Sequence, residues 1–418
     1  MRKRGLSYDN ESKKICDDFF LTLTTLCYSL PYLSSSFYTQ FLEAFSLSNT
    51  QAGFLMSMFS LTATPGYLFG GIIADKFSPK KVIMLSQLLT AALGYAMCLI
   101  QGYSILLVCY LGFGISTTFL HWSAYLKLVR AQANENEEGK IFGFFETCAA
   151  VVGAVTSYGI LGLLGHISSF RVVTAIYASI LVVVTIIIGL TLEDPKNEQA
   201  SNEFNVRMVG KALAHPVTWI NGFIVMGLFI LATGTSYLNP YLCSVFGTSV
   251  EFGTALAIAN RTVIRIFVVG IGGLLLDRRK TPKILIVCSL SLAVITVALF
   301  LLPQNPSMMV VAAVLAILLI CIAIIARPGM YTPIPEAKVP MEITGTAMGI
   351  TSAVGYSTDL WLYTLCGNWL DAYGNAGYRN ILLLYLAGLA VVVICAFLLR
   401  RYEKSHNLIS SASGSIES

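Results

Sequence analysis

The chain has 418 residues, of which 56% are hydrophobic and only 12% are charged, and its mean hydropathy is +0.73. Soluble domains carry about 25% charged residues, so this composition excludes a soluble protein of two or three domains. The net charge of +5 is small, and it gives no reason to expect a nucleic-acid partner.

Apolar runs of roughly 20 residues recur along the chain, and each is long enough to cross a hydrocarbon core of about 30 Å. They predict an all-α membrane protein with twelve transmembrane helices. The first six runs are 17–40, 51–74, 82–101, 104–127, 141–165 and 171–192. The last six are 216–240, 249–275, 282–302, 308–326, 343–366 and 378–400.

The longest polar stretch, Glu193–His215, separates the sixth run from the seventh. We expect it to be a solvated tether with a short surface helix over residues 205–213. The sequence therefore predicts two six-helix bundles joined by a linker. The predicted bounds are 1–192 for the N-terminal bundle, 193–215 for the cytoplasmic linker, 216–400 for the C-terminal bundle and 401–418 for a cytoplasmic tail.

Lys and Arg residues are distributed unevenly between the loops. Of the 27, 23 lie in the termini, the linker and alternate loops, whereas the opposite loops hold only Arg171 and Arg379. Cytoplasmic loops of membrane proteins carry the excess of Lys and Arg. We therefore predict that both termini are cytoplasmic, as an even number of spans requires.

Two loops, 202 residues apart, have nearly the same sequence. Residues 70–81 read GGIIADKFSPKK and residues 272–283 read GGLLLDRRKTPK. A repeat at about half the chain length predicts two copies of one architecture, which is typical of membrane transporters. We expect Asp75 to lie at a helix end, where the N-terminus of a neighbouring helix favours a carboxylate, and Gly70 and Gly71 to allow close helix packing.

Such a contact can hold one conformation and be released in another, so both copies are candidates for a conformational lock. The candidate lock residues are Gly71, Asp75, Lys76, Lys80, Gly273, Asp277 and Arg278.

Charged residues also lie inside the predicted spans. Arg261 and Arg265 share one face of the eighth span, because they are four residues apart, and they lie about 24 and 18 Å from Asp277 along a helix. An Arg at that depth costs roughly 2.5–3.5 kcal/mol on insertion scales unless it faces water, a ligand or an anionic partner. The candidate partners are Glu146 and Asp359.

The loop after the second span resembles the signature of the major facilitator superfamily, Gly-x-x-x-Asp-Arg/Lys-x-Gly-Arg/Lys-Arg/Lys. Gly71, Asp75, Lys76 and the pair Lys80/Lys81 match it, whereas Ser78 replaces the usual Gly and Pro79 displaces the basic pair by one place. A weaker copy follows the eighth span, where the family carries it. The resemblance covers the whole chain and implies two pseudo-symmetric six-helix bundles.

Three further stretches resemble the bacterial sugar-phosphate and organic-anion permeases of that superfamily. They are GKIFGFFE (139–146), PMEITGTAMGI (340–350) and GYSTD (355–359).

The resemblance also implies a position for most of the spans. Spans 2, 5, 8 and 11 meet between the halves, and spans 1, 4, 7 and 10 line a central cavity. Polar residues on the lining spans then become candidates for the site, although an aromatic stripe is more often packing. The candidate substrate or coupling residues are Arg261, Arg265, Asp359, Glu146, His121, Tyr125, Tyr28 and Tyr32, with Asn221 and Tyr237 in the seventh span.

These features predict a secondary active transporter that works by alternating access. Two arginines with few opposing carboxylates favour a small anionic organic solute, because guanidinium binds carboxylate or phosphate through two hydrogen bonds. Coupling to protons or to a counter-anion is expected. The alternatives are a drug or metabolite efflux antiporter and a non-transporting nutrient sensor on the same fold.

The sequence shows no phosphate-binding P-loop, no zinc-hydrolase HExxH motif and no Cys/His cluster. We therefore expect no enzyme activity, no cofactor and no metal. The expected partners are membrane lipid, the solute, and protons or a counter-anion, but no nucleic acid. We expect a monomer in a bacterial inner membrane.

Overall fold

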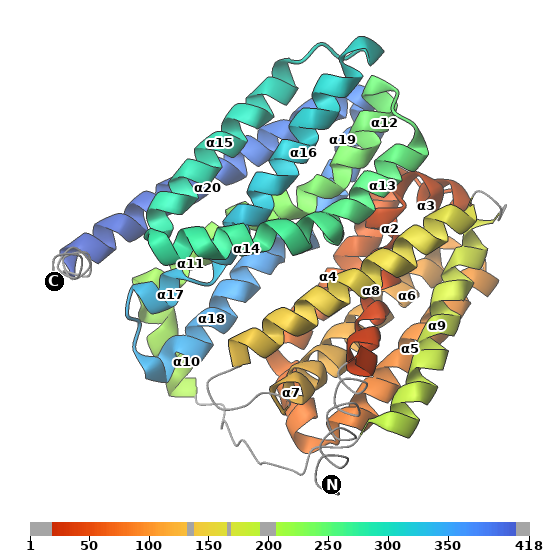
Figure 1. Ribbon diagram of the computed structural model, residues 1–418, viewed down its shortest axis with the longest axis horizontal. Coiled ribbons are helices and arrows are strands. Elements are labelled where there is room, and N and C mark those ends of the chain that lie inside the picture. Colours follow the sequence, from red (N-terminus) through yellow and green to blue (C-terminus); the bar gives the residue numbers. More distant parts are fainter. Residues whose placement is uncertain (1–18, 132–137, 165–168, 193–205, 407–418) are drawn as a thin grey trace, which may run out of the picture. The chain divides into compact units, whose positions relative to one another are not determined.

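The computed structural model describes residues 19–131, 138–164, 169–192 and 206–406, and all of their regular structure is helical (Figure 1). The chain divides into two compact units. The first comprises Met1–Asn202 together with Arg261–Val263, and the second comprises Glu203–Asn260 together with Ile264–Ser418.

The first unit is a bundle of long helices preceded by short ones. In it α5 packs against α6 and α9, and α4 packs against α6 and the π-helical segment η2 (Figure 1). Its elements are η1 (Thr24–Ser29), α2 (Leu33–Ser36), α3 (Tyr38–Phe45), α4 (Asn49–Lys76), α5 (Pro79–Leu99), α6 (Tyr103–Gly114), η2 (Ile115–Trp122), α7 (Ser123–Ala131), α8 (Glu138–Leu164) and α9 (Phe170–Thr191).

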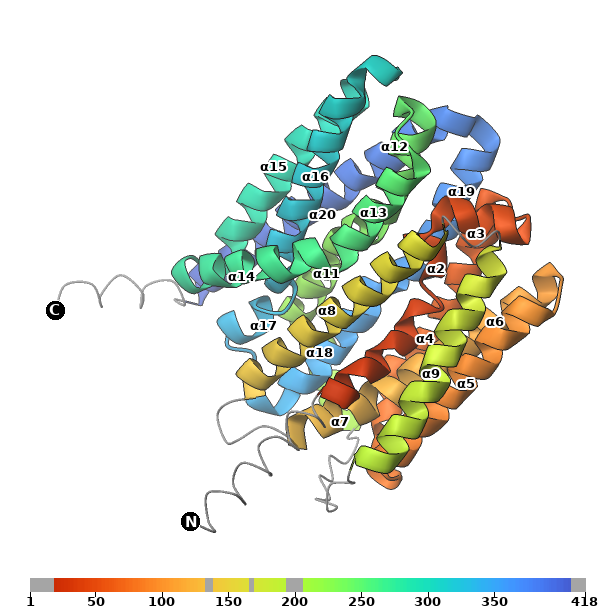
Figure 2. The ribbon, with the colours of Figure 1, turned by 45° about the vertical axis from the view of Figure 1, so that its right-hand side comes forward.

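In the second unit α15 packs beside α16 and α20, as α5 does beside α6 and α9, and α11 packs beside α18 and α20 (Figure 2). Its N-terminal part contains α10 (Val206–Ala214), α11 (Pro216–Gly234), η3 (Thr235–Tyr237), α12 (Leu238–Phe246), α13 (Val250–Arg261), α14 (Val263–Arg278) and α15 (Thr281–Leu301). Its C-terminal part contains η4 (Pro306–Met308), α16 (Met309–Ala326), η5 (Arg327–Met330), α17 (Pro333–Glu336), α18 (Met341–Tyr356), η6 (Ser357–Leu360), α19 (Leu362–Tyr373), η7 (Gly374–Ala376) and α20 (Gly377–Ser405).

The expected spans correspond to helical segments. Within the described residues, eight stretches are long and apolar enough to cross a membrane, and the last, Met341–Ser405, contains two of the expected spans. The other seven are Pro79–Leu99, Tyr103–Val129, Thr147–Leu164, Phe170–Thr191, Pro216–Phe246, Thr281–Leu301 and Pro306–Met330. The 28-residue helix α4 covers the second expected span.

The first and eighth expected spans are broken rather than continuous. In the first, η1 ends at Ser29 and α2 begins at Leu33. Pro31 lies in this gap and has no N–H to continue a helix. In the eighth, α13 and α14 are separated at Thr262 without a proline or glycine. Discontinuous membrane helices often form the binding sites of transporters.

The two halves are pseudo-symmetric in their packing. The expected spans 3 and 6 pair as α5 and α9, and their counterparts 9 and 12 pair as α15 and α20. The helix bounds at the repeated loops also correspond. One loop lies between Lys76 and Pro79, the other between Arg278 and Thr281, which is the 202-residue offset of the sequence repeat.

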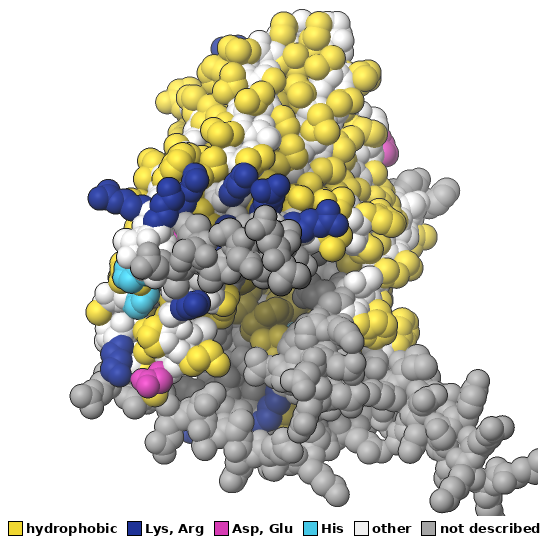
Figure 3. All heavy atoms as spheres, turned by 60° about the vertical axis from the view of Figure 1, so that its left-hand side comes forward, with side chains coloured by type: hydrophobic (Ala, Val, Ile, Leu, Met, Phe, Trp, Pro, Cys, Tyr) yellow, Lys and Arg dark blue, Asp and Glu magenta, His cyan; other side chains and the backbone are white. Residues whose placement is uncertain are grey.

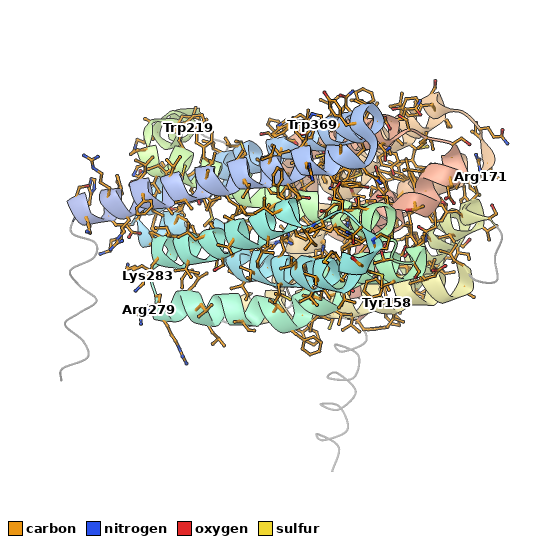
Figure 4. All side chains as sticks on the ribbon, turned by 90° about the horizontal axis from the view of Figure 1, so that it is seen from above. Tyr158, Arg171, Trp219, Arg279, Lys283 and Trp369 are labelled. Carbon is orange, nitrogen blue, oxygen red and sulfur yellow. The ribbon has the colours of Figure 1, made fainter. Side chains whose placement is uncertain are left out.

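On the face shown in Figure 3, hydrophobic side chains predominate in the upper part, and Lys and Arg side chains form a row along its lower edge. In the second unit, Arg279 and Lys283 lie at the same end as the C-terminus of α20, which carries the exposed Arg400 and Arg401 (Figure 4). This is the end that we predict to face the cytoplasm.

The short helix expected in the linker is present as α10, which packs against α18. Lys211 of α10 forms an exposed ion pair with Glu342 at 3.5 Å. Surface ion pairs of this kind contribute about 0–1 kcal/mol, so packing rather than charge holds α10 in place. Residues 193–205, the rest of the predicted linker, lie outside the described residues.

Candidate substrate and coupling site

Three predicted site residues meet in the first unit. The ring of His121 stacks on Tyr125, with ring centres 5.4 Å apart, and meets the Tyr28 ring edge-on at 5.4 Å. The Tyr28 hydroxyl donates a hydrogen bond to the carbonyl oxygen of Thr117 at 2.9 Å. His121 is fully buried, and its Nε2 lies 2.9 Å from the hydroxyl of Thr24. The Nδ1 atom of His121 makes no hydrogen bond to any described residue.

His121 lies in η2, a π-helical segment within the fourth expected span. The Thr62 hydroxyl of α4 donates to the carbonyl oxygen of Leu111 at 2.8 Å, just before the segment begins. A side chain on Gly114 would collide with Thr62, and one on Gly66 would collide with Thr118. Glycines therefore let α4 and η2 approach closely, and π-turns of this kind are frequent at functional sites.

Arg261 and Tyr32, two further predicted site residues, are also in contact. The guanidinium carbon of Arg261 lies 4.1 Å from the centre of the Tyr32 ring, well within the range of about 6 Å for a cation–π interaction. The Tyr32 ring is held edge-on by Phe59, 5.6 Å away. Arg261 is exposed, and it forms no ion pair with a described residue.

Arg265 lies in α14 and is half-buried. Glu146, the partner that we predict for it, lies in α8, and its side chain is outside the described part of the structure. The Glu146–Arg265 bridge stays a prediction.

Asp359 is buried in the second unit, with 9% of its surface exposed. The hydroxyl of Thr233 donates a hydrogen bond of 2.9 Å to its Oδ1 atom. Among the described residues no ion pair to Asp359 is seen, and its pairing with Arg261 or Arg265 stays a prediction. Asp359 lies in η6, a short 3-10 segment that interrupts the eleventh expected span and packs against α11, α18 and α19.

Asp75 and Asp277 occupy matching places in the two loops. Each is the second-last residue of its helix, α4 and α14 respectively. Their side chains lie outside the described part of the structure, so their locking role stays a prediction. Lys76 and Arg278, which follow them, are exposed.

The departures of the first loop from the signature have a local structural reason. Ser78 is the N-cap of α5, where its side chain accepts a hydrogen bond from the N–H of Lys81 at 3.2 Å. Pro79 follows at the first helical position, where its missing N–H is tolerated. Lys80 donates to the carbonyl oxygen of Gly189 at 2.9 Å, near the end of α9. A Lys near a helix C-terminus is favourable, which gives Lys80 a structural role.

Gly70, which we expected to allow close packing, and Gly272 at the matching position of the second loop both lie against a neighbouring helix. A Cβ on Gly70 would lie 3.0 Å from the carbonyl oxygens of Thr118 and Phe119. One on Gly272 would collide with the carbonyl oxygen of Ile325. Gly273 has open space around it, so in the second loop the close contact is made by Gly272. Adjacent helical residues point about 100° apart, and only one of the two can face the neighbouring helix.

Sequence reasoning missed Glu336, which caps the helix after the second loop. Its carboxylate accepts hydrogen bonds from the N–H and the hydroxyl of Thr281, at 3.2 and 2.8 Å. Glu336 thereby accepts a hydrogen bond from the first turn of α15, as Ser78 does from the first turn of α5. Thr233, the partner of Asp359, was also missed, as were Trp122 and Tyr67, whose rings are 6.1 Å apart. Trp122 follows the candidate His121 directly in the sequence, and this position could have marked it as a candidate too.

Comparison with known families settles which fold this is. A family model described as Major Facilitator Superfamily matches residues 19–360. The chain belongs to the Major Facilitator Superfamily. Members of this superfamily are secondary transporters and not enzymes, so the predicted transporter class is confirmed.

Two curated relatives in this superfamily come from Escherichia coli (strain K12). Inner membrane protein YqcE is 27% identical over 388 residues, which are 89% of this chain and 91% of the relative. Inner membrane protein YihN is 28% identical over 384 residues, which are 86% of this chain and 90% of the relative. Both are inner membrane proteins, as we predict for this multi-pass chain.

Solved structures of other superfamily members confirm the fold. A bacterial homologue of the human lysosomal transporter Spinster, in an inward-facing and occupied conformation, matches with a TM-score of 0.71 and 16% identity, over 94% of this chain and 97% of the other. The nucleoside transporter NupG, as a D323A mutant, matches with a TM-score of 0.73 and 15% identity, over 93% and 99%. At these identities the likeness shows the fold alone.

Proposed function

We propose that this superfamily member moves a small organic anion across the membrane by alternating access, and that Arg261 binds the anionic group. The observation that supports this most directly is the guanidinium of Arg261 over the Tyr32 ring, exposed and without an ion pair to a described residue. A cation within a predicted membrane span needs water, a ligand or an anionic partner to offset its desolvation.

The geometry of the contact favours an acceptor with two oxygens. A ring at 4.1 Å occupies the flat face of the guanidinium and does not cover the N–H groups at its edge. Those groups form a planar fork that binds a carboxylate or a phosphate through two parallel hydrogen bonds. Tyr32 therefore orients Arg261 without neutralising it.

Further aromatic rings of the first unit favour an organic rather than an inorganic anion. Tyr28, Tyr67 and Trp122 are all half-buried. Trp122 lies edge-on to both tyrosines, with ring centres 6.5 and 6.1 Å apart. Aromatic side chains supply a large apolar surface together with a polar edge, which suits a ring or chain that bears hydroxyl groups. The exposed charge of Arg261 disfavours a cationic drug, and so argues against the efflux alternative for that class.

The experiment is a thermal-shift screen of the purified protein. A ligand that binds only the folded state raises the unfolding temperature. Sugar acids, sugar phosphates and dicarboxylates should raise it, whereas nucleosides and cationic drugs should not. The shift should disappear in Arg261→Gln. It should persist in Arg379→Gln, a matched control in which an exposed Arg also lies over an aromatic ring, Phe300, at 5.9 Å. Stabilisation by cationic drugs but by no anion would contradict the proposal.

A further inference from the structure

Asp359 is a buried carboxyl group that the proposed binding of an anion does not use. It lies in the interrupted part of an apolar stretch, where η6 separates α18 from α19. Its Oδ1 accepts the hydrogen bond from Thr233, and its Oδ2 makes no hydrogen bond to a described residue. Thr233 is itself buried, at the end of α11.

Among the described residues of the elements that pack against it, no cation is placed to balance a negative charge on Asp359. The elements packed against η6 are α11, α18 and α19. Their charged residues, Glu342 and Asp371, are both acidic and lie more than ten positions away in the chain. The tyrosines on these elements, Tyr356 and Tyr363, supply no cation. A buried carboxylate without a cation is stabilised by taking up a proton.

A second set of hydrogen bonds connects this carboxyl group with Arg261. Thr233 is two residues before Thr235, the first residue of η3. The hydroxyl of Thr235 accepts a hydrogen bond from Nδ2 of Asn260 at 3.0 Å. Asn260 directly precedes Arg261 in α13. Two threonines at the junction of α11 and η3 therefore make both bonds. Thr233 bonds to Asp359, and Thr235 bonds to Asn260, the residue before Arg261.

We propose that Asp359 binds the coupling proton, and that Thr233, Thr235 and Asn260 link its protonation to anion binding at Arg261. The coupling to anion binding rests on the proposed function, whereas the assignment of Asp359 as a proton site does not. In each cycle one proton enters from one side, is held on Oδ2 and leaves to the other side, and no bond of the solute changes. Protonation weakens the acceptor that Thr233 faces, because hydrogen bonds to charged groups are the stronger ones.

A proton suits this site better than a metal cation does. Among the described residues, no group of three or more His, Cys, Asp and Glu side chains could hold a metal ion. The Thr233 hydroxyl points its hydrogen at Asp359, whereas a cation needs oxygen lone pairs. The site thus presents a carboxyl group and a hydrogen-bond donor.

The first test needs no solute. Infrared difference spectra of the protein in lipid, recorded between pH 5 and 9, should contain a carboxylic-acid C=O band that is absent in Asp359→Asn. Thr233→Val should shift the pH at which the band disappears. Thr233→Ser, which keeps the hydroxyl, should return that pH to its wild-type value. Thr296→Val is the matched control, because this buried Thr bonds only its own helix at Leu292, at 2.8 Å. A band unchanged in Asp359→Asn would overturn the proton site.

The second test concerns the link to Arg261. Binding of glucuronate and of glucose 6-phosphate, the two probes, is measured at pH 6 and pH 8. Affinity should change at least about fivefold with pH in the wild type, which corresponds to about 1 kcal/mol of coupling. The change should vanish in Asp359→Asn and in Asn260→Ala, while Asn260→Ala keeps the infrared band. If neither probe binds the wild type, the proposed function fails and the infrared result still decides the proton site. Binding that depends on Na⁺ and not on pH would overturn the coupling proposal.

Discussion

Gly70 and Gly272 occupy equivalent places in the two halves, 202 residues apart, and each faces the backbone carbonyls of a neighbouring helix. Gly70 of α4 meets Thr118 and Phe119 in η2, and Gly272 of α14 meets Ile325 in α16. Small residues in membrane helices allow this approach. The internal repeat therefore preserves a contact between helices as well as a loop sequence.

Adding a methyl group at this contact should destabilise the fold. Gly272→Ala forces the Cβ against the Ile325 carbonyl, and overpacking typically costs about 1–3 kcal/mol. Gly273→Ala is the adjacent control, and it should stay within about 0.5 kcal/mol because the space there is open. Unfolding midpoints in detergent measure both variants. Equal midpoints for the two would show that α14 does not pack through Gly272.

Asp75→Asn should impair transport more than folding. The carboxylate at the end of α4 is predicted to hold one conformation, and the amide keeps its shape without the charge. Transport rate in proteoliposomes should fall at least tenfold, equivalent to about 1.4 kcal/mol, while the detergent-solubilised yield stays near wild type. A parallel loss of both would make Asp75 a folding residue.

Arg261 should be sensitive to the shape of its cation as well as to its charge. Arg261→Lys keeps the charge and loses the planar fork, so anion affinity should fall about tenfold, whereas Arg261→Gln should lower it about 100-fold. These losses correspond to about 1.4 and 2.7 kcal/mol. Equilibrium binding of an anion found in the screen measures them. Wild-type affinity in the Gln variant would refute a role for Arg261 in binding.

Glu146 and Arg265 should behave as a coupled pair if they form the predicted bridge. Removing one partner leaves a buried charge unpaired, which costs more than removing both. Glu146→Gln and Arg265→Gln should therefore each impair transport, and the double variant should recover part of the loss. Strictly additive losses in this double-mutant cycle would mean that the residues are not coupled.

His215 should make the stability of the second unit sensitive to acid. Burial, together with the nearby His406, lowers the pKa of His215, which lies outside the spans, at the start of α11, with its ring 6.1 Å from that of Tyr402. The folded state disfavours the charged imidazole. The free energy of unfolding is therefore undiminished above the unfolded pKa of about 6.5, and it decreases as pH falls below that value.

Unfolding midpoints between pH 8 and pH 5 provide the measurement for His215. His215→Gln should flatten the decline, and His406→Gln should reduce it in part, because one repelling charge is removed. If the dependence of the unfolding midpoint on pH is unchanged in both variants, His215 and His406 are excluded as a source of acid sensitivity.

The sequence by itself determined the class of this protein. Hydropathy runs and the repeat at residues 70–81 and 272–283 are properties of local composition, and a bilayer leaves few alternatives to helices for such runs. Helical rise alone predicted a deep position for Arg261 and made it a site candidate.

Only the tertiary structure decided which side chains meet. That Gly272 rather than Gly273 faces a neighbour depends on how α14 is rotated against α16, and hydropathy does not record the rotation of a helix that is apolar all round. The contacts of Tyr32 with Arg261 and of Thr233 with Asp359 join residues more than 100 positions apart. Such pairs follow from the packing of whole helices and from the breaks at Thr262 and η6, so no local pattern in the sequence could predict them.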